Sequence, residues 1–164
     1  ERVPQTLFLV PLATRETRAM FETALYRNQA EDLPLTMLFG HAHDAMSAAD
    51  AVLVASGTAT LEAALLGKPM VITYKMPAAS HWLLQGKGYL PYYGLPNILA
   101  GEFVVPEIIQ DDATPQNLSQ ALLNLLGDES VRTRLARRFS AMSASLQRCA
   151  ARQAALAVLP LLET

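Results

Sequence analysis

The residues with the clearest chemical potential lie in one short segment, Val52–Ala63. Its sequence, VLVASGTATLEA, predicts a buried strand, a turn of small residues and a helix that starts at once near Thr58. The first N–H groups of a helix lack partners within it and carry partial positive charge, so they can bind a phosphate. Helix capping, which also favours serine and threonine, is the alternative. The candidate phosphate ligands are Ser56, Gly57, Thr58 and Thr60.

One carboxylate, Glu62, stands about a turn into the expected helix. A carboxylate can accept hydrogen bonds from both hydroxyls of a ribose, and a hydrogen bond to a charged group contributes about 1.5–3 kcal/mol. A phosphate site with an acidic residue beside it is typical of a nucleotide site, so we predict a nucleotide ligand. The alternative is a glutamate that only complements the helix dipole.

Further polar residues stand at two other places in the chain. The first group is His41, His43 and Asp44, which no third strong ligand with a recognised spacing accompanies, so we predict no metal site there. We expect these residues to line a ligand cleft or to begin a helix. The second is Asn97, an amide among apolar neighbours that can bind a base, a sugar or its own loop. Glu107 is ambiguous in the same way.

Alternating strands and helices are expected to position these residues. Apolar runs predict strands, and apolar residues three to four apart predict helices. The expected strands are 6–12, 35–39, 51–55 and 69–74, and the helices between them are 14–29, 42–49 and 58–66. Such alternation indicates parallel β-α-β units with right-handed crossovers. Because ligands bind at the carboxyl ends of such strands, the turns after Phe39, Ala55 and Tyr74 should lie on one side of the molecule.

The pattern changes after Pro77. We expect a helix over 78–85, a loop over 86–101 and a short helix or strand over 106–110. Three helices are then expected over 114–126, 130–146 and 148–162, the first with Thr114 as its cap and Pro115 at its first position. We expect these helices to pack on the sheet or on a neighbouring domain. The predicted fold class is α/β: a Rossmann-like parallel sheet with helices on both faces and a helical C-terminal tail.

Composition narrows the class of protein. The chain has 164 residues and a formal net charge of -2, so there is no electrostatic case for binding nucleic acid. The single cysteine, Cys149, cannot form an internal disulfide, which agrees with a reducing compartment. No run approaches the roughly 20 apolar residues that cross a bilayer. Because the chain opens at Glu1 without an initiator methionine and runs almost directly into a strand, we interpret it as an internal piece of a longer protein.

Several segments, taken in order, resemble the lipid-A-disaccharide synthases, which form glycosyltransferase family 19. The segments are Ala55–Ala63 (ASGTATLEA), Pro69–Val71 (PMV), Tyr74–Met76 (YKM), Leu95–Gly101 (LPNILAG) and Val105–Glu107 (VPE). The resemblance implies an inverting hexosyltransferase of the two-domain GT-B architecture. Such an enzyme joins UDP-2,3-diacylglucosamine to 2,3-diacylglucosamine 1-phosphate and yields lipid A disaccharide 1-phosphate and UDP.

The same resemblance implies that residues 1–164 form the UDP-sugar binding domain, incomplete at its N-terminus, without the domain that carries the catalytic base and the acceptor site. By position, Glu62 would meet the ribose and Asn97 would lie near the donor. The diphosphate would face Ser56, Gly57, Thr58 and Thr60. Where the family usually has an arginine, in a G-x-x-R-[ED]-A-M pattern, this chain has His43, which is charged only part of the time near neutral pH. The chain alone should bind UDP weakly and should not catalyse the transfer reaction.

The resemblance further implies a cytoplasmic enzyme, peripheral to the inner membrane of a Gram-negative bacterium, without a cofactor or a metal. The expected partners are the UDP-sugar donor and the acylated glucosamine phosphate acceptor, with peripheral membrane contact and a homodimer as further candidates. The aromatic segment 82–93 is a candidate for membrane contact or for packing against another domain or subunit. Two alternatives stay open: another UDP-sugar transferase or epimerase of GT-B fold, and a non-catalytic α/β interaction module.

Overall fold

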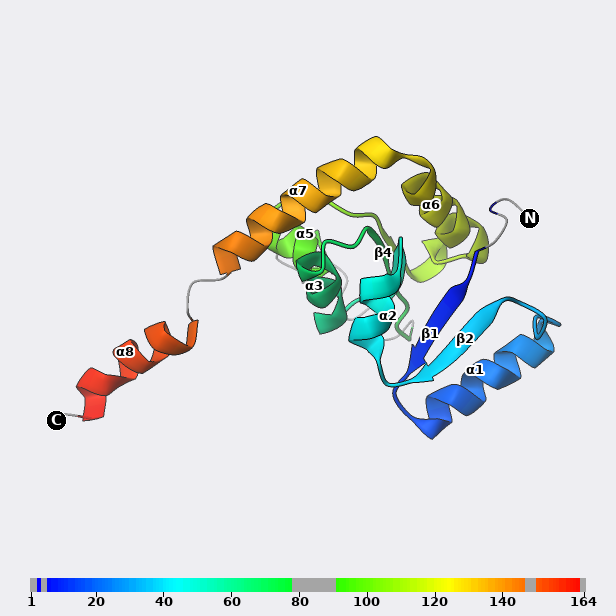
Figure 1. Ribbon diagram of the computed structural model, residues 1–164, viewed down its shortest axis with the longest axis horizontal. Helices are drawn as coiled ribbons and strands as arrows, with labels where there is room; N and C mark the ends of the chain where they lie inside the picture. Colours follow the sequence, from blue (N-terminus) through cyan, green and yellow to red (C-terminus); the bar gives the residue numbers. More distant parts are fainter. Residues whose placement is uncertain (1–2, 4–5, 78–90, 147–149, 163–164) are drawn as a thin grey trace. The chain divides into compact units, whose positions relative to one another are not determined.

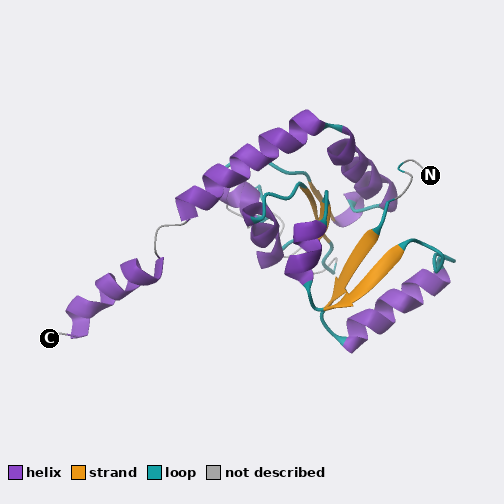
Figure 2. Cartoon of the chain, viewed as in Figure 1, coloured by secondary structure: helices purple, strands orange, loops and turns teal. Residues whose placement is uncertain are grey.

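The computed structural model describes residues 3, 6–77, 91–146 and 150–162, which belong to two compact units, Glu1–Ala49 and Asp50–Thr164 (Figure 1). Each unit combines parallel strands with helices, as Figure 2 shows. The α/β class and the parallel pairing predicted from the sequence are therefore confirmed within each unit, and each unit is described by itself.

The first unit is a parallel strand pair with its connecting helix. Its elements are β1 (Phe8–Leu12), α1 (Arg15–Arg27), β2 (Leu35–Phe39) and α2 (Ala42–Ala48). The strands pair in register, with Phe8 opposite Leu35. Helix α1 begins with a capping box, in which the Thr14 and Thr17 hydroxyls each accept a backbone N–H of the other residue at 3.1 Å. This local pairing explains why the sequence predicted the start of α1 correctly.

The second unit contains a three-stranded parallel sheet in the order β3-β4-β5. The strands are β3 (Val52–Ala55), β4 (Met70–Tyr74) and β5 (Glu107–Ile109), and helix α3 (Thr58–Leu65) follows β3. Helices α3 and α6 both contact the central strand. In β4, Met70, Val71 and Ile72 are all fully buried, and since successive side chains of a strand point to opposite faces, both faces of β4 are covered. The core of this unit therefore centres on β4.

Helices complete the second unit. They are α5 (Leu95–Ala100), the 3-10 turn η1 (Gln110–Asp112), α6 (Pro115–Gly127), α7 (Glu129–Leu146) and α8 (Ala150–Leu162). Thr114 caps α6 by accepting the Asn117 N–H at 3.2 Å, with Pro115 at the first position, as predicted. Helix α6 packs on β4, so the expectation that the C-terminal helices pack on the sheet is confirmed for α6, whereas α7 packs on α3 and α6.

One prediction about this unit needs correction, and the structure decides between two alternatives in another. The loop expected over 86–101 is wrong in its last part, because residues 95–100 form α5, with Pro96 in its first turn and Gly101 ending it at a φ of 69°. Proline near the start and glycine just after the end are typical of a short helix as well as of a loop. Of the two structures expected over 106–110, the strand is correct for Glu107–Ile109. The helix expected over 78–85 and residues 82–90 of the aromatic segment lie outside the described residues.

Candidate functional site

The turn between β3 and α3 presents a helix N-terminus that no side chain of the described residues caps. Its N-cap residue is Gly57, whereas threonines cap α1 and α6. Gly57 has a φ of 152°, which L side chains rarely adopt, and a Cβ added there would meet nothing within 4 Å. The backbone therefore calls for glycine at this point. The Thr60 N–H donates to the Gly57 carbonyl at 3.1 Å, so the N–H groups at the opening of α3 that face a ligand are those of Thr58 and Ala59.

Thr60 does not share that open position. Its side chain is fully buried, and its hydroxyl donates to the Gly57 carbonyl at 2.7 Å and accepts the Leu95 N–H at 3.3 Å. A phosphate oxygen needs a donor, and the only proton of this hydroxyl is already engaged. The expectation that Thr60 contacts the diphosphate is therefore corrected: Thr60 holds the turn from its inner side.

The other two hydroxyls of the segment differ from each other. Ser56, half-buried, donates its Oγ proton to the Tyr93 carbonyl at 2.9 Å. Thr58 is exposed, and within the described part of the chain its hydroxyl has no hydrogen-bond partner. Thr58 is therefore the hydroxyl best placed to donate to a ligand, whereas Ser56 links the turn to the segment before α5.

Glu62 lies four residues after Thr58, so the two share a face of α3. The opposite face carries Thr60, Ala63 and Ala64, which are buried. Glu62 is half-buried, and among the described residues its carboxylate makes no hydrogen bond or ion pair. It also lies beyond the first turn of α3, which contains no acidic residue, and the dipole effect fades within one turn. This geometry disfavours the dipole alternative and favours a ligand for Glu62.

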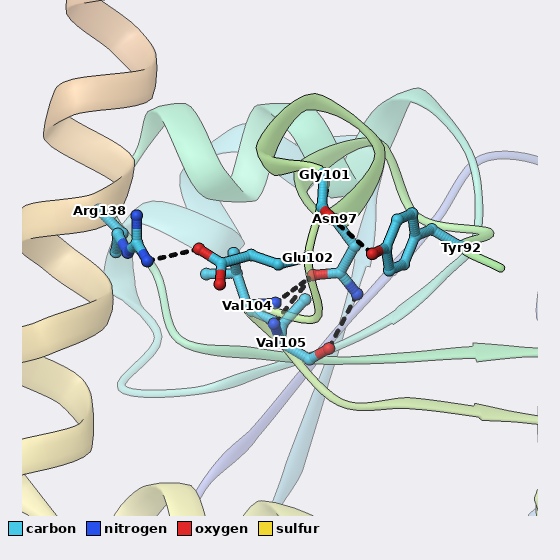
Figure 3. A network of polar contacts seen from close by, with 7 residues as sticks. All are labelled: Tyr92, Asn97, Gly101, Glu102, Val104, Val105 and Arg138. Carbon is cyan, nitrogen blue, oxygen red and sulfur yellow. Dashed lines mark hydrogen bonds and ion pairs between the residues drawn. The ribbon is translucent and has the colours of Figure 1, made fainter. Parts of the chain in front are cut away.

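Asn97 is buried within its own loop. Its Oδ1 accepts the N–H groups of Val104 and Val105 at 2.8 and 3.0 Å (Figure 3). Its Nδ2 donates to the Val105 carbonyl at 2.9 Å and to Glu107 Oε1 at 2.8 Å. An amide has two donor hydrogens and two acceptor lone pairs, so its capacity is filled, and the side chain has no accessible surface. Of the partners that the sequence left open for this amide, its own loop is the one observed, and a place for Asn97 near the donor stays a prediction.

Contacts around the same loop hold α5 to its neighbours (Figure 3). The Tyr92 hydroxyl donates to the Gly101 carbonyl at 2.7 Å, and the Tyr92 ring packs edge-on against Phe103 with centroids 4.8 Å apart. Arg138 of α7 forms an ion pair with Glu102. Helix α3 contacts both α5 and α7, so the loop, these two helices and the α3 turn form one packed assembly within the second unit.

Glu107 is the residue whose role sequence reasoning did not resolve. Its carboxylate accepts the N–H groups of Tyr93 and Gly94 and one amide hydrogen of Asn97, all at 2.8 Å. The only signal in the sequence was the short distance between the LPN and VPE segments. That spacing placed the two segments in one stretch without showing that they bind each other.

The polar residues that follow β2 belong to the first unit and form an exposed cluster. His41 is the N-cap residue of α2, with Nδ1 2.9 Å from Asp44 Oδ2, and His43 Nδ1 lies 3.9 Å from Asp44 Oδ1. The hydrogen bond from His41 lowers the pKa of Asp44, and the charges of both histidines act in the same direction. The described residues contain no group of three or more His, Cys, Asp or Glu arranged to hold a metal ion. Of the two interpretations, the helix start is observed, and a ligand role for His43 stays a prediction.

Two hollows on the surface of the second unit lie away from the α3 opening. One runs along α7 and includes Arg134 and Arg137, and another lies between α7 and the end of α3, beside Gly67. Neither includes a residue of 56–62.

Within the described chain no helix has both the length and the apolar character that crossing a membrane requires.

Comparison with known proteins identifies the family. A family model described as lipid-A-disaccharide synthetase matches residues 1–159. The chain is 58% identical to the lipid-A-disaccharide synthase of Azoarcus sp. (strain BH72) over 164 residues, which are 100% of this chain and 42% of that protein. It is 55% identical to the protein of the same name from Dechloromonas aromatica (strain RCB) over 157 residues, 96% of this chain and 41% of that protein. The chain thus spans about two fifths of the length of these curated relatives. Because the family model covers almost every residue, the chain belongs to the lipid-A-disaccharide synthetase family.

Proposed function

We propose that the protein to which this chain belongs is an inverting glycosyltransferase that joins UDP-2,3-diacylglucosamine to 2,3-diacylglucosamine 1-phosphate and releases UDP. Within that enzyme, this chain binds the UDP-sugar donor. Membership of the lipid-A-disaccharide synthetase family supports the reaction. The observation that carries donor binding is the uncapped N-terminus of α3 at Gly57, with Thr58 and Glu62 on one face behind it.

The diphosphate is proposed to meet the opening of α3. Negative charge builds on UDP as its bond to the sugar breaks, and groups already oriented toward that charge lower the barrier most. The N–H groups of Thr58 and Ala59 and the Thr58 hydroxyl supply such donors. The helix dipole adds about 0.3–1 kcal/mol at an exposed site. Gly57 admits the phosphate because it presents no side chain to the approach.

The ribose is proposed to meet Glu62. Four residues of α-helix rise about 6 Å along the axis, so a ligand seated at Thr58 extends over Glu62 in the direction of the helix. A ribonucleoside offers two adjacent hydroxyl donors, and a carboxylate offers two acceptor oxygens. The half-buried position of Glu62 shields these hydrogen bonds from competition with water.

The remaining predicted residues take revised or weaker parts in this proposal. Ser56 and Thr60 support the turn through bonds inside the chain, and Asn97 binds the loop that follows α5. His43 stays a predicted phosphate ligand.

Deprotonation of the acceptor hydroxyl is assigned to a carboxylate outside this chain. Acylated substrates partition into a bilayer, so we propose that the enzyme works in the cytoplasm, at the surface of the inner membrane of a Gram-negative bacterium.

The proposal is tested on the full-length protein. Its thermal unfolding is measured with UDP and, separately, with AMP, and UDP alone should raise the melting temperature. Transfer from acylated and non-acylated UDP-sugars is then compared, because a different sugar transferase or an epimerase would accept the latter. Absence of any UDP-specific shift would leave the non-catalytic module as the better interpretation.

A further inference from the structure

Glu107, the first residue of β5, lies where hydrogen-bond donors from three residues converge. Its Oε2 accepts the Tyr93 N–H, and its Oε1 accepts both the Gly94 N–H and one Nδ2 hydrogen of Asn97. Gly94 is the N-cap residue of α5 and supplies no side chain to cap it. The Glu107 carboxylate, from the neighbouring strand β5, instead binds the N–H groups of this N-cap residue and of Tyr93 just before it.

The same short segment binds the α3 turn on its other side. The Tyr93 carbonyl accepts the Ser56 hydroxyl at 2.9 Å, and the Leu95 N–H donates to the Thr60 hydroxyl at 3.3 Å. Thr60 in turn donates to the Gly57 carbonyl at 2.7 Å. Residues 93–95 thus connect the Glu107 carboxylate to the turn that opens α3.

Close packing leaves this connection little freedom. A Cβ added at Gly94 would lie 2.2 Å from Ile72 Cδ1 and 3.2 Å from Glu107 Oε1. Ile72 and Glu107 are paired residues of β4 and β5, and Ile72 is fully buried. The carboxylate is therefore fixed to the sheet. If its hydrogen bonds change, the residues that must move are those of segment 93–95 rather than those of β5.

We propose that Glu107 is a positioning residue for the donor site. By fixing Tyr93 and Gly94, its carboxylate holds Ser56 and Gly57 in the conformation that keeps the first N–H groups of α3 turned to the ligand. This inference rests on the proposed function, since the donor is what the α3 opening would bind.

The test is Glu107→Gln in the full-length enzyme. Glutamine keeps the shape of glutamate but replaces one acceptor oxygen with an NH2 group. That group faces N–H donors and cannot accept a hydrogen bond from them. At least one bond to residues 93, 94 or 97 is then lost. We expect the KM for the UDP-sugar to rise about tenfold, because the loss of a hydrogen bond to a charged group corresponds to about that factor. The KM for the acceptor should not change.

The matched control is Glu102→Gln, the same chemical change at an exposed glutamate just after α5 that pairs with Arg138. Its donor KM should equal that of the wild type. If the role of Glu107 were purely structural, Glu107→Gln would have a lower melting temperature and a smaller fraction of active enzyme, and therefore a lower apparent kcat. The donor KM of its folded fraction would equal that of the wild type. That result would overturn the inference.

The outcomes separate the inference from the proposed function. A wild-type enzyme that UDP does not stabilise overturns both. A wild-type enzyme that UDP stabilises, together with an unchanged donor KM in Glu107→Gln, overturns the positioning role alone. If Glu107→Gln does not fold, Ser56→Ala carries the test, since it cuts the link on the other side of Tyr93. A raised donor KM in that variant supports the role, and an unchanged one overturns it.

Discussion

Replacing Glu62 with glutamine in the full-length enzyme should weaken donor binding with little effect on folding. The side chain makes no hydrogen bond or ion pair with the described residues, so its removal breaks no contact among them. Glutamine retains one acceptor oxygen and loses the negative charge. If the ribose hydroxyls bind the carboxylate, the loss is that of one charge-assisted hydrogen bond, about 1.5–3 kcal/mol. At 1.4 kcal/mol per factor of ten, the donor KM should rise ~10- to ~100-fold.

The assay is steady-state kinetics with the UDP-sugar varied at saturating acceptor, together with thermal unfolding in the absence of ligand. The control is Glu129→Gln, at the exposed first residue of α7, where a glutamate does complement a helix dipole. Should Glu62 act only on its helix, both variants would lose a little stability and keep the wild-type donor KM. That outcome would refute the assignment of Glu62 to the ribose.

Three further predictions concern the turn, the loop and the start of α7. Gly57→Ala should lower the free energy of unfolding by about 1–3 kcal/mol and raise the donor KM, because alanine must adopt a φ of 152°. Chemical denaturation measures the first effect, and steady-state kinetics measures the second. Asn97→Ala should destabilise the protein by about 2–5 kcal/mol, since it leaves buried N–H groups of the loop unpaired, and a variant with wild-type stability would contradict the network. Hydrogen bonds from Ser130 and Val131 lower the pKa of Asp128, so its charged form is favoured by folding. The stability that Asp128 contributes should be present above the ordinary aspartate pKa and be lost as the pH falls through its lowered pKa in the folded protein. The melting temperatures of Asp128→Ala and wild type should therefore differ at pH 7 and converge as the pH falls through that lowered pKa.

Local patterns were enough to predict most of the elements. The apolar run of β4 and the caps of α1 and α6 depend on residues within a few positions of one another. Gly57 and Gly67 bound α3 much as expected, because a positive φ at both makes glycine the favoured residue. The chemistry of the α3 opening was also visible in the sequence, since an uncapped helix start needs only a glycine in the right place.

The sequence by itself determined the α/β class, the order of the elements and the glycine turn that opens α3, because each depends on neighbours in the chain. The tertiary structure decided which of the polar side chains are taken up by bonds inside the chain and which stay without a partner among the described residues. Thr60 and Asn97 have the right chemistry, yet their bonds to Leu95 and Glu107 turn them inward. Those partners lie 35 and 10 residues away, and no periodicity encodes such pairings. They arise only when α3, α5 and β5 pack together and each buried polar group must find a partner.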